Sequence, residues 1–282
     1  MKKILMMVCL AVALVAMPAC KGGQKKTMLP TKGNVTEIVD SIKNQAMDLF
    51  AKIRSEQSNI IRDVKVLPEN IRVVPARFFM PLEASQNAVT LAQQCALIGV
   101  YSVDNQYDKL AYGTKDVSKR DNVIAKMTTM ANLSGDAQGE IDRLKKLNQE
   151  DFNAEVDKIA IERFEQALED NDADCYLIIL LYSIVESALN QEAIFELKNG
   201  YVDDEQIVDD LMPFKSAIIN VVDLVELLKP YYSTLNIVAP MVDKLKAVLT
   251  ANNEDNKTIA VLNAFNYVKE MRGKLNVSVN AD

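Results

Sequence analysis

The chain contains no histidine and no tryptophan among its 282 residues. Without histidine, Ser-His-Asp and Cys-His catalysis, facial-triad iron, most catalytic zinc sites and histidine pH switches are excluded. The formal charge of −7, with 25% charged residues, is not the basic balance of a nucleic-acid-binding protein. A hydrophobic share of 49% excludes a largely disordered chain.

Helix-breaking residues are scarce over long stretches. No proline occurs between Pro81 and Pro213, and no glycine occurs between Gly139 and Gly200 or between Gly200 and Gly273. Apolar residues recur with the i, i+3, i+4, i+7 spacing of an amphipathic helix, and alternating strand patterns are nearly absent. The sequence therefore predicts an all-α fold.

We expect a single-domain bundle of about eight or nine helices around two buried central helices. The expected helices cover 34–65, 83–112, 116–133, 136–147, 149–169, 172–199, 204–229, 237–251 and 255–272. The central pair is expected at Leu91–Val103 and Cys175–Leu189, where apolar residues cover most of the helix circumference. The uninterrupted apolar run Cys175–Tyr182 is shorter than the roughly 20 residues of a membrane span.

Three glycines are expected just after helix ends, where a left-handed residue is favoured: Gly113, Gly200 and Gly273. Gly99 instead lies inside an apolar helix, where glycine costs about 1 kcal/mol relative to alanine. We expect Gly99 to allow a close helix crossing, and the approach of a ligand is the alternative.

The first twenty residues have the pattern of an export signal. Lys2 and Lys3 precede the apolar stretch Ile4–Met17, which is followed by Ala19 and Cys20. This arrangement resembles the lipobox of bacterial lipoproteins, with Met17 and Pro18 in place of the usual leucine and small residue. The resemblance implies that Cys20 is lipidated, with diacylglycerol and chains such as palmitate, and becomes the mature N-terminus. The alternative is an ordinary signal peptide with an incidental cysteine.

A basic linker precedes an acidic body. Residues 21–33 contain four lysines, three glycines, one proline and no acid, a composition typical of a flexible linker. Six of the 32 basic residues and none of the 39 acidic ones lie within the first 33 positions, so the remainder carries a formal charge of −13. We expect a signal peptide over 1–19, a lipidated cysteine and linker over 20–33, and a helical domain over 34–282.

The linker also bears on location. Lys21 stands where an aspartate would retain a lipoprotein of enteric bacteria in the inner membrane. The linker also lacks the acidic residues that direct surface export in some other Gram-negative groups. We therefore expect a cell-envelope protein, lipid-anchored in the outer membrane and facing the periplasm. The lysines either attract anionic lipid head groups or form a plain spacer.

Two cysteines remain after Cys9 leaves with the signal and Cys20 is acylated. Cys95 and Cys175 could form a disulfide, because bridges persist outside the cytoplasm. Both lie in strongly apolar helical segments, and cysteine is among the most frequently buried residues. We favour two buried free thiols over a Cys95–Cys175 bridge.

The body also resembles a protein family. Leu97–Asp104 reads LIGVYSVD and is similar to a stretch of uncharacterised all-helical lipoproteins of Gram-negative anaerobic bacteria. Short similarities follow in order at Glu162–Phe164, Ile184–Glu186 and Val225–Tyr231. The resemblance covers roughly residues 85–231 and implies a helical fold and an envelope location, with no known activity. Asp40-Ser41-Ile42 resembles the O-glycosylation signal of such bacteria, which makes Ser41 a candidate site.

Glu186 is the most informative polar residue. It interrupts an otherwise apolar helix, where a carboxylate must find donors, raise its pKa or face a cavity. One hypothesis is a ligand pocket near Glu186 with Tyr101 and Tyr182 as donors. The hypothesis that we favour is a glutamate hydrogen-bonded to a neighbouring helix or reaching solvent.

Other chemistry-bearing patterns fail. Asp170, Asp172 and Asp174 imitate the start of an EF-hand loop, but Cys175 replaces its glycine and Leu181 its bidentate glutamate. No glycine-rich phosphate loop and no Gly-x-Ser-x-Gly elbow is present in the sequence. We expect no catalytic residue, no metal and no cofactor.

Three functions are compatible with these observations. The favoured one is a non-enzymatic interaction or scaffold module of the cell envelope, anchored to the membrane and binding a protein or envelope partner, with no nucleic acid. The alternative is a small-ligand carrier with its pocket near Glu186. The third is a histidine-free enzyme that uses paired carboxylates.

Lipidation predicts that Cys20→Ala releases the protein from the membrane fraction, because the acyl chains are its only expected anchor. Fractionation and the mass of the N-terminal peptide measure this. Unchanged pelleting with membranes, together with an N-terminal peptide free of acyl mass, would contradict the prediction.

Overall fold

The computed structural model describes residues 38–66, 79–112, 117–130, 147, 149–199, 215–250 and 254–275. Every regular element in these ranges is a helix, so the predicted all-α class is confirmed. The elements are α2 (Asp40–Val66), α3 (Ala84–Asn87), α4 (Leu91–Tyr112), α5 (Val117–Met130), α7 (Gln149–Glu169), α8 (Ala173–Asn199), α10 (Lys215–Leu228), the 3-10 helix η4 (Ser233–Ile237), α11 (Ala239–Thr250) and α12 (Glu254–Leu275).

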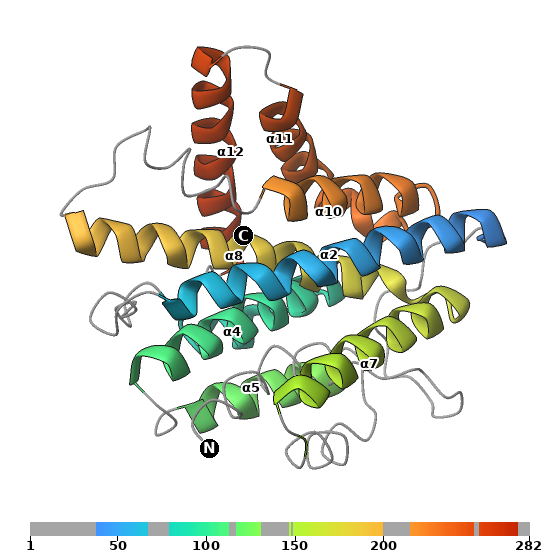
Figure 1. The fold of residues 1–282 in the computed structure, drawn as a ribbon, viewed down its shortest axis with the longest axis horizontal. Helices are drawn as coiled ribbons and strands as arrows, with labels where there is room; N and C mark the ends of the chain where they lie inside the picture. The colour runs from blue at the N-terminus through green and yellow to red at the C-terminus, as the bar shows by residue number, and fades with distance from the viewer. Residues whose placement is uncertain are drawn as a thin grey trace.

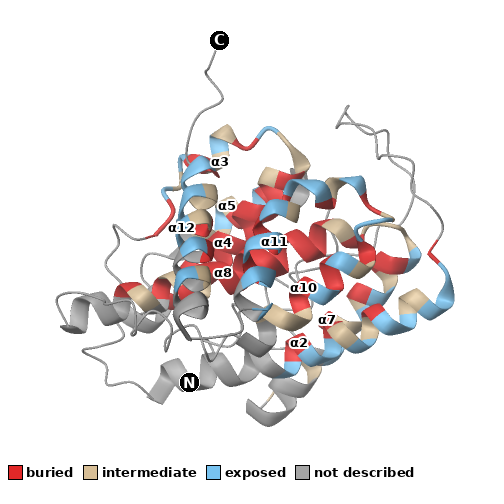
Figure 2. Cartoon of the chain, turned by 90° about the horizontal axis from the view of Figure 1, so that it is seen from above, coloured by how far each residue is buried: buried red, intermediate tan, exposed pale blue. Residues whose placement is uncertain are grey.

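The centre of the fold is the pair α4 and α8, as the apolar runs predict. These two helices share the most extensive helix–helix contact of the described chain. They run in the same direction, because Cys95 contacts Cys175 near their starts and Tyr107 contacts Ser187 further along. Figure 2 shows their buried residues in the middle of the molecule, surrounded by helices with exposed outer faces.

The remaining helices cover this pair. α2 packs against α10 and α7, and the rings of Phe50 and Phe164 stack with their centroids 4.2 Å apart. α5 lies against α4, and α11 pairs with α12. In Figure 1, α2, α4 and α8 run across the view, whereas α11 and α12 stand upright against that layer.

Gly99 lies where α4 crosses α8 most closely. A Cβ atom at this position would lie 2.5 Å from the main-chain carbonyl oxygen of Ile179 and 3.2 Å from the amide nitrogen of Ser183. The Ser183 hydroxyl donates to the carbonyl of Ile179 and also lies 3.4 Å from that of Gly99. The expected close crossing is confirmed, since only glycine lets the two backbones approach this far.

The two cysteines form a disulfide one helical turn before the crossing. Cys95 and Cys175 are bridged, with their Cα atoms 5.6 Å apart, inside the usual range for disulfides. The expectation of two free thiols is therefore wrong. Both residues are buried as expected, but the close parallel pairing of α4 and α8 also brings them into register with each other.

The expected helix 83–112 is divided in two. α3 ends at Asn87, and α4 begins after Thr90. The Thr90 hydroxyl accepts from the amide of Gln93, and the Gln93 side chain accepts from the amides of Thr90 and Val89. This reciprocal capping box starts a new helix, and its Thr-x-x-Gln signal is present in the sequence.

The helix ends also differ from the expectation. Gly273 lies inside α12 rather than after it, while Gly113 and Gly200 lie outside the described residues. The left-handed residue that does end a helix is Asn171, with φ of 55°. The amide of Asp172 then donates to the carbonyl of Ala167 in a Schellman motif, where asparagine replaces the more common glycine.

Other expected segments fall partly or wholly outside the described residues. These are the signal and linker, most of 136–147 and the first part of 204–229. The expected helix 34–65 begins at Asp40, 149–169 matches α7, and 172–199 matches α8 to within one residue. The expected helix 237–251 is preceded by the 3-10 turn η4, and α11 begins at Ala239.

One described helix is long and apolar enough to cross a membrane, judged by length and composition alone. It spans Ala173–Asn190 of α8, and 89% of that window is buried inside the protein. The central helix of a helical bundle passes the same test, and the contacts of α8 with α4, α7 and α10 give it that place here.

The crossing predicts opposite effects for two glycine substitutions. Gly99→Ala should lower the free energy of unfolding by about 1–3 kcal/mol, because its Cβ meets a backbone carbonyl that cannot move without separating the helices. Gly273→Ala should raise it by about 0.5–1 kcal/mol, because no heavy atom lies within 4 Å of the added Cβ on this exposed helical position. Urea unfolding measures both, and equal effects would place α4 and α8 further apart than the structure does.

Candidate functional site

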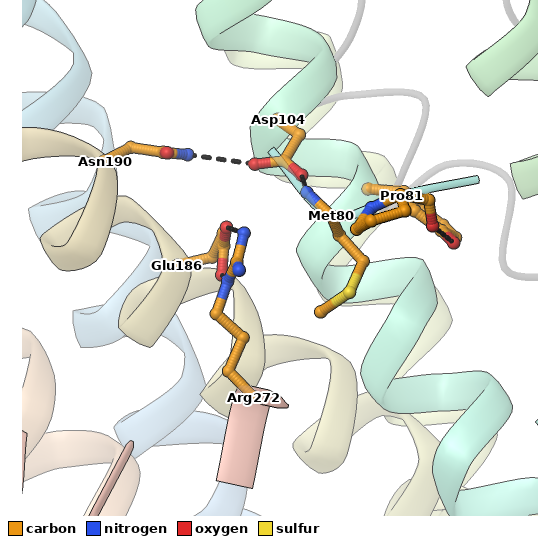
Figure 3. Close-up of polar contacts among 7 residues, drawn as sticks. Met80, Pro81, Asp104, Glu186, Asn190 and Arg272 are labelled. Carbon is orange, nitrogen blue, oxygen red and sulfur yellow. Dashed lines mark hydrogen bonds and ion pairs between the residues drawn. The ribbon is translucent and has the colours of Figure 1, made fainter. Parts of the chain in front are cut away.

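Three buried polar side chains and one partly buried arginine meet where α4 and α8 continue beyond the crossing. Asp104 comes from α4, Glu186 and Asn190 come from α8, and Arg272 comes from the last turn of α12. In Figure 3, Arg272 reaches from α12 to Glu186, while Asn190 points across to Asp104. We call these four residues the buried polar cluster, and it joins three helices that are far apart in the sequence.

Asp104 is fully buried and accepts two hydrogen bonds. Its Oδ2 atom accepts from the main-chain amide of Met80 at 2.7 Å, and its Oδ1 atom accepts from the side-chain amide of Asn190 at 3.1 Å. The exposed fractions of Asp104 and Asn190 are 0% and 1%. Asp104 thereby connects α4 to α8 and to the segment before α3.

Glu186 forms a two-pronged ion pair with Arg272. The Nε atom of Arg272 donates to Oε2 at 2.6 Å, and one terminal nitrogen donates to Oε1 at 2.5 Å. The Glu186 side chain is 1% exposed and that of Arg272 is 20% exposed. Such a planar bidentate pair fixes both distance and orientation, so it determines how the end of α12 docks on α8.

Burial dominates the electrostatics of this cluster. Loss of hydration raises the pKa of Asp104, and the charge of Arg272 only partly offsets this. Loss of hydration also raises the pKa of Glu186 well above its usual value, and the neighbouring Asp104 raises it further. Burial by itself would lower the pKa of Arg272, but its hydrogen bonds to Glu186 and the two negative charges raise it, so the guanidinium stays charged.

The structure gives Tyr101 an acceptor other than Glu186. The Tyr101 hydroxyl donates to the carbonyl oxygen of Pro81 at 2.7 Å, and burial raises its pKa. Tyr182 is also buried, which, with a smaller contribution from Tyr267, raises its pKa to about 12. Glu186 is instead hydrogen-bonded to a neighbouring helix, the arrangement that the sequence favoured.

Three members of the cluster were missed by the sequence analysis. The sequence could have identified Asp104, because this residue directly follows the apolar run Leu91–Val103. An aspartate at that position is either buried with the helix or marks the point where the buried part of the helix ends. Asn190 lies one helical turn after Glu186 on the same face. Arg272 carries no such signal, since it lies among other charged residues on an amphipathic helix.

The other candidate positions are simple to place. Ser41 lies exposed in the first turn of α2, while Cys20 lies outside the described residues. Asp170 and Asp172 lie at the junction between α7 and α8, and Asp174 lies in the first turn of α8. Within the described ranges, no group of three or more Cys, Asp or Glu residues could hold a metal ion.

Comparison with known proteins adds no relative. The chain matches no protein-family model, no curated protein and no solved structure. The chemistry of the site is therefore argued from its own geometry. Its carboxylates use their oxygens on Met80, Asn190 and Arg272, so the cluster is arranged to hold helices together.

This geometry predicts a strong effect of Arg272→Met. Removing the guanidinium leaves two buried carboxyl groups without a counter-ion, which should lower the free energy of unfolding by about 3–5 kcal/mol. Lys274→Met is the matched control, because Lys274 forms an exposed pair with Glu270 one turn along the helix, and it should melt close to wild type. Thermal melts compare the two, and similar melting temperatures would mean that Arg272 does not anchor α12.

Proposed function

We propose that the protein is a lipid-anchored, non-enzymatic interaction or scaffold module of the cell envelope, held in the outer membrane and facing the periplasm. The observation that supports this function best is the buried polar cluster. Its charged groups bind one another across α4, α8 and α12, so they stabilise a defined helical body. A partner would then be recognised by the outer surface of that body.

The disulfide supports the compartment. A bridge such as Cys95–Cys175 persists in the periplasm or outside the cell and is rare in the cytosol. The export signal and the cysteine after Ala19 also support a location in the cell envelope. The two observations are independent, since one concerns the folded core and the other the N-terminal sequence.

The geometry of the carboxylates gives less support to a carrier or an enzyme. A paired-carboxylate mechanism needs two carboxyl groups that face a substrate. Asp104 and Glu186 are each 0% exposed and are bound by groups of the same chain. Tyr101, expected as a donor to a ligand, donates to the backbone before α3.

The test is crosslinking in intact envelopes with three forms of the chain. Wild type and Glu186→Gln should crosslink to the same envelope partner, because Glu186 lies in the interior, away from any surface contact. Cys20→Ala should lose that partner together with the membrane. Each form carries the crosslinker on exposed positions of α11, such as Asp243 and Lys244.

Three results would contradict the proposal. A wild-type protein that crosslinks to nothing would exclude an interaction module. A small molecule that remains bound to the purified wild type in native mass spectrometry, and is lost in Glu186→Gln at unchanged melting temperature, would establish a carrier. Turnover of a glycoside that disappears in the same variant would establish an enzyme.

A further inference from the structure

The charges of the buried polar cluster do not balance. Asp104 and Glu186 contribute two carboxyl groups, and Arg272 contributes one positive charge. The two described tyrosines that act on this site, Tyr101 and Tyr107, are uncharged, since burial raises the pKa of both and keeps their hydroxyls protonated. With both carboxyls ionised, two buried acids would face one positive charge, and the uncompensated negative charge is strongly unfavourable.

Within the described part of the chain, no further cation balances the site. Arg120 of α5 and Glu83 before α3 act on Tyr101, at the edge of the cluster. Lys269 of α12 lies about one turn from Arg272 but pairs with Glu192 at the surface, 2.9 Å away. Among the described charged groups that act on the two carboxyls, Arg272 is the one cation.

The hydrogen bonds leave the excess charge in place. Asp104 accepts from two uncharged donors, the main-chain amide of Met80 and the side-chain amide of Asn190. Arg272 directs two of its nitrogen atoms to Glu186. A single proton on the two carboxyl groups brings the cluster to zero net charge.

We propose that Asp104 and Glu186 hold one proton between them at neutral pH, and that this shared proton makes the docking of α12 through Arg272 sensitive to pH. The proton belongs to the pair and is not assigned to either residue. Docking can respond to this proton because α12 supplies the one counter-ion that the described residues offer to the pair, at the end of the helix that meets α8 (Figure 1).

The sign of the effect follows from linkage. The pKa of each carboxyl is raised in the docked state, whereas release of α12 would expose the pair to water and return both values toward their ordinary range. The docked state therefore binds one more proton than the released state above the ordinary carboxyl range. Docking weakens by about tenfold for each unit of rising pH, until the docked pair also loses its proton.

Infrared spectroscopy of the full chain tests the proton directly. At neutral pH the wild type should show the C=O stretch of a protonated carboxyl group, which Glu186→Gln and Asp104→Asn should each remove. Glu226→Gln is the control, since Glu226 forms an exposed pair with Lys246, and it should keep the band. A wild type without the band, or a band that survives in both cluster variants, would overturn the proposal.

Hydrogen exchange tests the coupling to α12. In wild type and Glu226→Gln, the protection factors of the amides around Met271–Leu275 should fall as the pH rises, by up to tenfold per unit. In Glu186→Gln they should be nearly independent of pH, because glutamine offers an N–H to Asp104 and an oxygen to Arg272 with no proton to release. Protection of α12 that is equally flat in wild type would overturn the coupling, even if the infrared band were present.

Discussion

The backbones of α4 and α8 are in contact at Gly99, and this contact constrains how the neighbouring residues of both helices pack. Because α4 and α8 approach until the Ile179 carbonyl would touch any Cβ at that position, facing residues on either side of the crossing come within bonding distance of each other. On one side of the crossing the chain uses a disulfide. On the other side it uses the buried polar cluster, about 8 Å further along the helix axis at Asp104, judged by the helical rise per residue.

Stability alone does not explain the buried polar cluster, because the desolvation of two carboxyl groups and a guanidinium offsets much of their mutual attraction. The cluster is better explained by the way it fixes the position and orientation of the helices that it joins. A ring of apolar side chains would let α12 slide or rotate on α8, whereas the bidentate pair of Glu186 and Arg272 accepts one register and one orientation. Asp104 imposes the same restriction on the segment at Met80.

The sequence carries enough information for the helical class, the two central helices and the close approach at Gly99, because each depends on a local pattern of apolar and small residues. It also indicates that Glu186 needs a partner. The identity of that partner depends on how α12 folds back after some 80 residues, which no local pattern encodes. The Cys95–Cys175 bridge was misjudged for the same reason, since apolar flanks predict burial and only the relative phase of two helices brings the sulfur atoms together. The capping box at Thr90 and the left-handed Asn171 were visible signals, outweighed by an unbroken apolar pattern and by the neighbouring aspartates.

The disulfide between α4 and α8 and the ion pair between α8 and α12 are different kinds of attachment, and this difference distributes stability unevenly over the fold. The disulfide holds α4 to α8 covalently and does not respond to protons, whereas α12 is attached by a charged group that meets an unbalanced pair of acids. Local opening occurs where buried contacts are fewest and most conditional, and we expect it at the α11–α12 pair rather than at α4 and α8. A partner in the envelope that binds α11 or α12 would act on the part of the fold whose attachment depends on the proton held by Asp104 and Glu186. The disulfide-linked helices α4 and α8 would meanwhile keep the remainder folded.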